Sequence, residues 1–181
     1  MMSALPHTYT DRNETGCCAI PNIEQWRDTV VNFDNVPFIR RHTLSLMYVP
    51  LNMSQVMTKL NEDAAPLQDN PETALDPQDA LILSRDLSPF RAEHLYRVTK
   101  AVLGADNVTL NGEFASIVRE GSFKEMGTWM KDMSAHVSTM GRQSSATYAF
   151  YTTCPKCAAH YGKNYVVLLA QLEPTTGATG G

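Results

Sequence analysis

Four cysteines stand in two close pairs, and paired thiols are the residues of this sequence best suited to bind a metal ion. Cys154 and Cys157 enclose a Pro-Lys dipeptide, and Cys17 is followed directly by Cys18. Two thiolates with this spacing can point at one tetrahedral ion. One such motif supplies half of a zinc site, and the other pair completes it if the amino-terminal segment folds back. We therefore predict a structural zinc ion held by these four residues, with His160 as a further candidate ligand.

Two other interpretations of the thiols stay open. A C-P-x-C pair can form a disulfide, and its first thiol can be acidic. We weigh this redox interpretation lower, because we expect no helix close behind Cys157 whose dipole would lower the thiol pKa. The third interpretation is two ordinary reduced thiols at a turn. Because adjacent cysteines rarely bind one ion together, either Cys17 or Cys18 could also be idle.

A single glutamate is the best candidate for acid–base chemistry. Glu93 lies in an alternating run, 91–102, that predicts a strand. In a concave face among Tyr and Trp side chains, it would serve as a general acid or base, or stay charged and hold a cation. The simpler interpretation, which the sequence favours, is a solvent-facing glutamate paired with Arg91 or Arg97.

Several other chemistries have little support. Ser84 and Ser88 have no flanking glycines of the nucleophile-elbow type, and neither a P-loop nor a dinucleotide fingerprint is present. The net charge of −4, without a basic run, argues against a nucleic-acid partner. No apolar run is long enough to span a bilayer, and the first ten residues do not resemble a secretory signal. We therefore expect a cytoplasmic protein that binds neither nucleic acid nor a membrane.

The elements that must position these residues follow from hydrophobic periodicity and from turn residues. Aromatic and β-branched residues on both sides of the cysteine motif predict a hairpin of two antiparallel strands over 147–172. The other predicted elements are strand 41–49, helix 53–65, strand 80–83, strand 91–102, strand 108–119 and helix 122–140.

The order strand, helix, strand, strand occurs twice, over 38–102 and over 108–172. We therefore predict one α+β domain, 38–173, with a curved antiparallel sheet and both helices on one face. The concave face, lined by both halves, would form a small-molecule cleft. Residues 1–37 are expected to be an arm packed on this body, and 174–181 a disordered tail.

This element order and two stretches resemble the GyrI-like small-molecule-binding family, the effector-binding domains of multidrug-responsive regulators. The stretches are 112–126, G-E-F-A-S-I-V-R-E-G-S-F-K-E-M, and 146–151, A-T-Y-A-F-Y. The resemblance implies a cleft for hydrophobic or cationic compounds, and some stand-alone members resemble hydrolases of strained electrophiles. It implies a catalytic role for Glu93 and ligand-binding roles for His94, Tyr96 and Trp129. The cysteine pairs, and the lack of a preceding DNA-binding helix pair, depart from the family pattern.

We accordingly expect a stand-alone protein that binds a small hydrophobic or aromatic ligand, as a monomer or a homodimer. It would hydrolyse an aromatic or electrophilic compound with Glu93, helped by Tyr96 and Trp129. One alternative is a zinc-binding or thiol-redox protein centred on the cysteines. Another is a non-catalytic ligand sensor that works through a partner protein.

Overall fold

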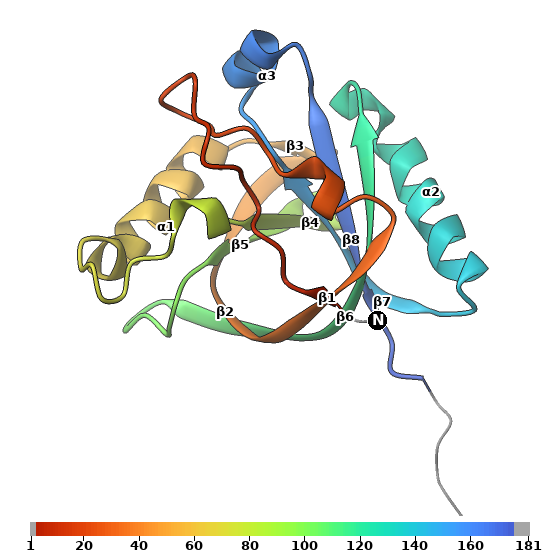
Figure 1. Ribbon diagram of the computed structural model, residues 1–181, viewed down its shortest axis with the longest axis horizontal. Coiled ribbons are helices and arrows are strands. Elements are labelled where there is room, and N and C mark those ends of the chain that lie inside the picture. The colour runs from red at the N-terminus through yellow and green to blue at the C-terminus, as the bar shows by residue number, and fades with distance from the viewer. Residues whose placement is uncertain (1–2, 176–181) are drawn as a thin grey trace, which may run out of the picture.

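The strands of this protein close into a barrel in the computed structural model, which describes residues 3–175 (Figure 1). Within this range β2, β5, β4, β7, β8 and β6 are successive neighbours, and β6 pairs with β2 again, so the six strands form a closed antiparallel barrel. The elements in chain order are β1 (Ser3–Ala4), η1 (Ile23–Gln25), β2 (Thr29–Leu46), β3 (Val49–Pro50), α1 (Met53–Gln68), η2 (Pro77–Asp79), β4 (Ile82–Ser88), β5 (Arg91–Arg97), β6 (Asp106–Glu120), η3 (Phe123–Glu125), α2 (Met126–Thr139), β7 (Ser144–Tyr151), α3 (Pro155–Tyr161) and β8 (Tyr165–Leu172).

The length of β2 makes the closure possible, because this strand pairs along both edges. Its residues 38–44 pair with β5, and its residues 29–40 pair with β6. The register with β6 shifts between Phe33 and Val36, where Asn35 has a φ of 49° and its N–H donates to Asn111 Oδ1 at 2.8 Å. A bulge of this kind bends a strand and increases its twist, so β2 can curve around the barrel.

The prediction of an open curved sheet with two helices on one face is wrong. It began the first strand at Arg41 and assigned 29–37 to an arm, because Asp34, Asn35 and Pro37 interrupt the apolar pattern. With these residues in β2, the sheet closes on itself. The concave face that was expected to form a cleft is therefore the interior of the barrel.

Aromatic and aliphatic side chains fill that interior. Phe33 and Phe114 lie with ring centroids 4.4 Å apart, and both are at most 1% exposed. Trp26, just before β2, is fully buried in the same cluster, and the Ser116 hydroxyl donates to its carbonyl oxygen at 2.6 Å. Tyr9 packs edge-on against Phe150 at 5.9 Å. The amino-terminal residues therefore contribute directly to the barrel core.

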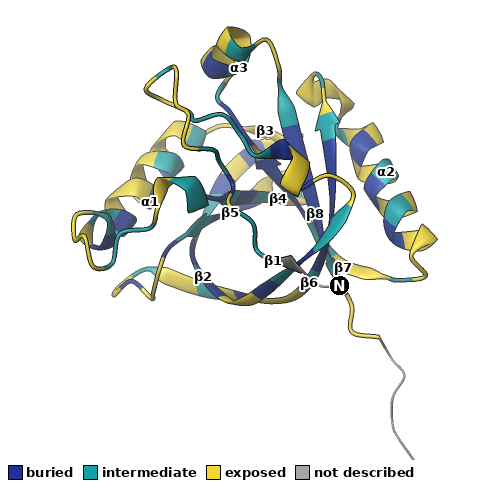
Figure 2. Ribbon diagram, viewed as in Figure 1, coloured by how far each residue is buried: buried dark blue, intermediate teal, exposed yellow. Residues whose placement is uncertain are grey.

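The two longer helices cover different parts of the outer wall, on opposite sides of the barrel in Figure 1, with their buried residues turned toward the strands (Figure 2). α1 packs Val56 and Leu60 against Ile39 of β2. α2 packs Trp129 and Met133 against β6, β7 and β8. The predicted hairpin is confirmed, since β7 and β8 pair antiparallel, but its connection contains α3. The domain boundaries stay a prediction, and 176–181 of the expected tail lie outside the described residues.

Replacing Trp26 by Ala should lower the free energy of unfolding by about 3–5 kcal/mol, because it leaves a large void in a packed core. Urea denaturation followed by circular dichroism measures this. Leu103→Ala is the matched control, since Leu103 is 102% exposed and its removal should change stability by less than about 0.5 kcal/mol. Similar midpoints for both variants would contradict the assignment of Trp26 to the core.

Candidate functional site

A hydroxyl, an imidazole and a second hydroxyl form a row across three neighbouring strands on the outer wall. Ser84 Oγ of β4 lies 2.8 Å from His94 Nδ1 of β5, and His94 Nε2 lies 3.0 Å from Thr43 Oγ1 of β2. Strand register produces the row. His94 is paired with Ser84 in β4 and with Arg41 in β2, and Thr43 lies two residues beyond Arg41 on the same face of β2. Leu83 and Leu95 belong to the interior cluster, so the alternating residues Ser84 and His94 face outward.

His94 is kept neutral by its surroundings. It is 2% exposed, and burial lowers its pKa to about 4, with a further lowering from His42 and an opposing effect of the Glu93 charge. A neutral imidazole has one N–H, so one of the flanking hydroxyls donates to the ring and the other accepts from it. The arrangement with Ser84 donating to Nδ1 makes His94 a proton acceptor for Ser84.

Ser84 is the solvent-reachable end of this row. It is half-buried, whereas Thr43 is fully buried. β4 lies between β5 and β7, whose outer faces contribute to the clusters under α1 and α2 respectively. Ala149 of β7 pairs with Ser84, and two residues further Tyr151 packs edge-on against Phe123 at 5.1 Å. A partly exposed aromatic pair is therefore carried by the same outer face of the barrel as Ser84.

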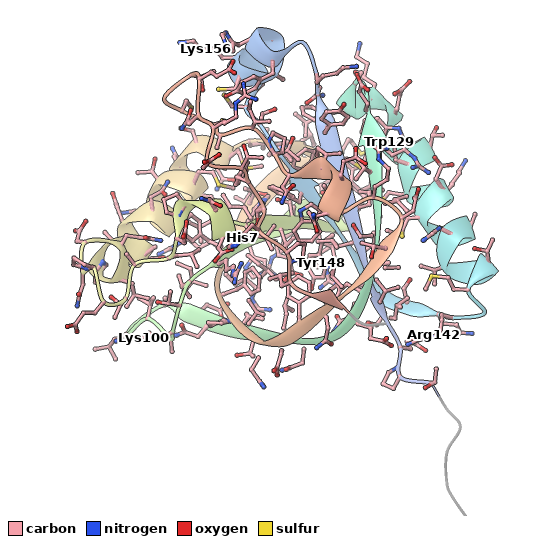
Figure 3. The ribbon with its side chains drawn as sticks, in the orientation of Figure 1. His7, Lys100, Trp129, Arg142, Tyr148 and Lys156 are labelled. Carbon is pink, nitrogen blue, oxygen red and sulfur yellow. The ribbon has the colours of Figure 1, made fainter. Side chains whose placement is uncertain are left out.

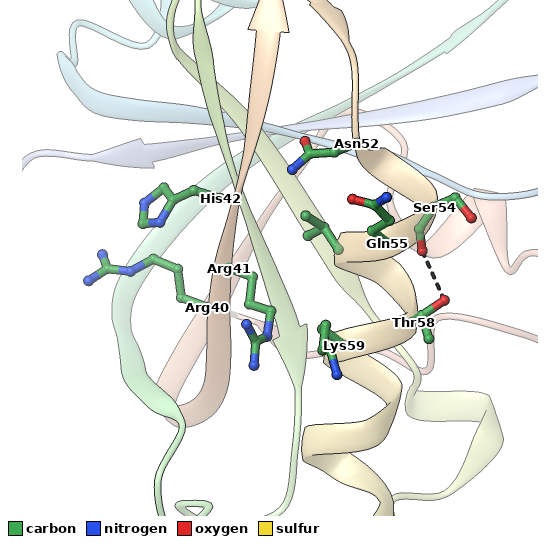
Figure 4. Close-up of a pocket in the computed structure, with 9 residues that line it drawn as sticks. Arg40, Arg41, His42, Asn52, Ser54, Gln55, Thr58 and Lys59 are labelled. Atoms are coloured by element: carbon green, nitrogen blue, oxygen red, sulfur yellow. Dashed lines mark hydrogen bonds between the residues drawn. The ribbon is translucent and has the colours of Figure 1, made fainter.

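A groove of about 690 Å³ lies between β2 and the amino-terminal half of α1 (Figure 4). In this view Arg41 lies on the α1 side of β2, whereas Arg40 and His42 point to the other side. Two cationic side chains of the groove already form ion pairs: Arg41 Nε lies 2.6 Å from the Asp63 carboxylate, and Lys59 Nζ lies 2.6 Å from the Glu62 carboxylate. The residues that line the groove are Arg40, Arg41, His42, Asn52, Ser54, Gln55, Val56, Thr58 and Lys59.

Glu93 lies inside the barrel, on the opposite face of β5 from His94. It is 3% exposed and accepts from Arg85 at 2.6 Å, and Arg40 lies 3.6 Å away. The Arg85 guanidinium also stacks 5.1 Å from the centre of the Tyr148 ring. Two cations beside one buried carboxylate offset the desolvation of its charge. Neither Arg91 nor Arg97, the partners considered from sequence, takes this position.

The four residues expected to share a cleft are not brought together. Glu93 faces the interior, whereas His94 and Tyr96 face the outer wall, with Tyr96 packed in the cluster under α1. Trp129 belongs to α2 and is 4% exposed in a separate cluster. Figure 3 shows Trp129 beside α2, well apart from Tyr148 in the barrel interior.

The four cysteines do come together, as the sequence predicts. Their sulfur atoms all lie within 4.8 Å of one another, although Cys17 and Cys18 stand 136 positions or more before the other pair. Cys154 N–H donates to Cys18 Sγ at 3.5 Å. His160 instead lies 3.5 Å from the Glu14 carboxylate. This cluster is compatible with a metal ion bound by four thiolates.

The expectation that no helix follows the cysteine motif is wrong. Cys154 caps α3, and Cys157 lies within it. Pro155 occupies the first turn, where a missing N–H costs nothing. Thr15 Oγ1 lies 3.3 Å from Cys157 Sγ, and this hydrogen bond is the main cause that lowers the pKa of Cys157 to about 6. A short connection of seven helical residues leaves too little periodicity to be detected in the sequence.

None of the helices among residues 3–175 is long and apolar enough to cross a bilayer.

Comparison with known proteins identifies a family. No significant match was found among curated proteins. The model of a family described as bacterial hydrolase matches residues 8–172, which include the barrel, the Ser84–His94 pair and all four cysteines. This differs from the GyrI-like family that the sequence resembles. The match covers most of the chain, and the protein therefore belongs to the bacterial hydrolase family.

Proposed function

We propose that the protein is a hydrolase of small activated esters, in which Ser84 is the nucleophile and His94 the general base. The observation that carries this proposal is the 2.8 Å contact between Ser84 Oγ and His94 Nδ1, with Thr43 bonded to the other ring nitrogen. A nucleophile, a base and a group that orients the base are the three parts of nucleophilic catalysis by serine. Sequence patterns alone do not predict this role, because no glycine-flanked motif surrounds Ser84.

The reaction proceeds by acyl transfer. Ser84 Oγ attacks the carbonyl carbon while His94 Nδ1 takes the hydroxyl proton, and the proton then passes to the departing alcohol. A water molecule, deprotonated by the same nitrogen, attacks the resulting acyl-serine. The bond between the acyl carbon and Ser84 Oγ then breaks, His94 Nδ1 returns the proton to Oγ, and the acid is released. Thr43 supports this reaction by accepting a hydrogen bond from Nε2–H, which keeps the proton on Nε2 and leaves Nδ1 free to accept the proton of Ser84.

The basicity of His94 points to the substrate class. A pKa of about 4 is well below the neutral pH at which a base is most effective, so His94 is a weak base. Esters with good leaving groups, such as aryl esters, need the least assistance. The partly exposed aromatic pair of Phe123 and Tyr151, on the same outer face as Ser84, suits an aryl group. This agrees with the aromatic or electrophilic ligand expected from the sequence.

Glu93 has a different part in this proposal from the catalytic one predicted from the sequence, which stays a prediction. Its carboxylate lies on the far side of β5 and is held by Arg85 and Arg40. Its charge raises the pKa of His94 against the effect of burial. In this proposal Glu93 influences His94 through its charge, without touching it.

A second proposal is that the four cysteines bind one structural zinc ion. Zn–S bonds of about 2.3 Å in a tetrahedron place sulfur atoms about 3.8 Å apart, so the observed cluster needs only a slight contraction. Four thiolates leave no open coordination position for a substrate or water. The ion would tie residues 17–18 to α3 without taking part in hydrolysis.

Ser84→Ala should lower the rate of hydrolysis of p-nitrophenyl acetate by about 10²–10⁴-fold, because it removes the nucleophile and its proton transfer. Ser88→Ala, on the same strand but without an imidazole partner, should keep the wild-type rate. Glu93→Gln should keep measurable activity with a changed pH dependence. Loss of activity in Glu93→Gln with full activity in Ser84→Ala would overturn the assignment in favour of a catalytic glutamate.

Hydrolysis by the wild type should be nearly independent of pH above about 6 and should decline as pH falls through about 4. The reason is that only the unprotonated imidazole accepts the Ser84 proton, and the pKa of His94 is about 4. Stability should also fall as pH goes from 6.5 to 4, because the unfolded histidine gains a proton that the folded one does not. Initial rates across pH check the first expectation. A midpoint near 6.5 would show a solvated histidine instead.

The purified protein should contain about one zinc ion per chain. Cys154→Ser should lose this ion and lower the melting temperature, because metal binding is coupled to folding, while the rate of ester hydrolysis is unchanged. Metal analysis and thermal denaturation provide the readouts. Four freely titrating thiols in the metal-free wild type, without thermal stabilisation by added Zn²⁺, would exclude the site.

A further inference from the structure

Two adjacent turns carry a group of exposed apolar side chains that the catalytic proposal does not use. Each is between 44% and 67% exposed. The group, here termed the hairpin patch, consists of Leu44, Leu46, Met47, Tyr48, Val49, Leu51, Leu87 and Phe90. Most large apolar side chains of the described residues are buried, so their concentration on the β2–β3 and β4–β5 turns needs a physical reason.

Backbone hydrogen bonds hold the hairpin patch in one shape. Ser45 N–H donates to Phe90 O at 2.8 Å, and Tyr48 N–H donates to Pro89 O at 2.9 Å, so the two turns are joined. Met47 and Tyr48 have φ values of 48° and 69°, a left-handed conformation that is unfavourable for bulky residues. A two-residue turn between the paired residues Leu46 and Val49 requires this conformation, so the turn fixes the backbone that carries these side chains.

The extent of the hairpin patch is that of an interface. The largest apolar patch on a monomeric protein usually covers about 300–600 Å². Eight side chains of this size, each about half to two-thirds exposed, present on the order of 800 Å², which is what one partner contributes to a standard protein–protein interface.

We propose that the hairpin patch is the contact through which two copies of this chain form a twofold-symmetric dimer. Such a contact brings the same surface of each protomer together, so the surface must not repel itself. No charged residue occurs between Thr43 and Thr58, or between Leu87 and Phe90. Asp86 and Arg91, of opposite sign, border the second turn, so Asp86 of one protomer can meet Arg91 of its partner.

An extended peptide and a membrane surface fit the hairpin patch less well than a second copy of the chain. An extended peptide adds to a free strand edge, but β3 is only two residues long, and its Pro50 has no N–H to donate. An anionic membrane attracts clusters of Lys and Arg, whereas this chain has a net charge of −4 and the hairpin patch has no such cluster among the described residues. Packing of side chains against the same patch of a second copy requires neither a free strand edge nor a cluster of Lys and Arg.

Sedimentation velocity of the full chain between 1 and 100 μM tests the proposal. The wild type should sediment as a dimer at the upper concentration, and Leu46→Glu should be monomeric, with association weakened at least 100-fold by a charge in the apolar centre. Leu103→Glu is the matched control, because Leu103 is fully exposed in the β5–β6 connection, outside the hairpin patch. It should dimerise as the wild type does.

Met47→Asn keeps the test valid if Leu46→Glu folds poorly. Asn tolerates the left-handed conformation of this position, so the variant should melt no lower than the wild type while its dimer is weaker. A wild type that stays monomeric at 100 μM would overturn the proposal, as would equal association of Leu46→Glu, Met47→Asn and Leu103→Glu. Flotation of the monomer with vesicles of phosphatidylcholine and phosphatidylglycerol would instead assign the surface to a membrane, and would equally overturn it.

Discussion

The pairing of β2 along both of its edges is the constraint on which the rest of the structure depends. Residues 38–40 of this strand hydrogen-bond in register with β5 on one side and β6 on the other, and this overlap completes the ring of strands. A closed six-stranded ring has an interior that side chains fill completely. Here aromatic rings and Trp26 occupy it. The concave face therefore offers no open cleft, and the Ser84–His94 row that we propose as the catalytic site lies on the outer wall.

Because side chains alternate between the two faces of a strand, β5 contributes residues to both the barrel interior and the outer wall. Glu93 and His94 are neighbours in sequence but lie on opposite faces of β5. Inside, the carboxylate forms ion pairs that hold Arg85 against Tyr148. Outside, the imidazole joins Ser84 to Thr43. The two groups are separated only by the backbone, so the interior charge influences the outer site without touching it, and both depend on one register.

The sequence predicted those features that depend on local patterns. The aromatic and β-branched runs identified β7 and β8, and helical spacing placed Trp129 and Met133 on one face. The cysteine pairs indicated a shared site before any geometry was known. The Ser84–His94 contact could not be found in this way, because it requires the register of β4 against β5 and no motif connects residues ten positions apart. The closure of the barrel was missed for a similar reason, since the bulge at Asp34 and Asn35 interrupts the apolar pattern by which a strand is recognised.

The thiol cluster and the Ser84–His94 row are separate in their physical basis, even though both join distant segments. The row depends on three strands whose backbones hydrogen-bond to one another, and it is fixed once the barrel has formed. The cluster joins a loop to the beginning of a short helix, and the Tyr161 hydroxyl of α3 also links the two by donating to Cys18 O at 2.7 Å. Trp26 lies eight positions beyond Cys18 and is anchored independently by its packing and by Ser116. An ion at the cysteines would add a further link between residues 17–18 and α3, and the geometry of the outer wall would not depend on it.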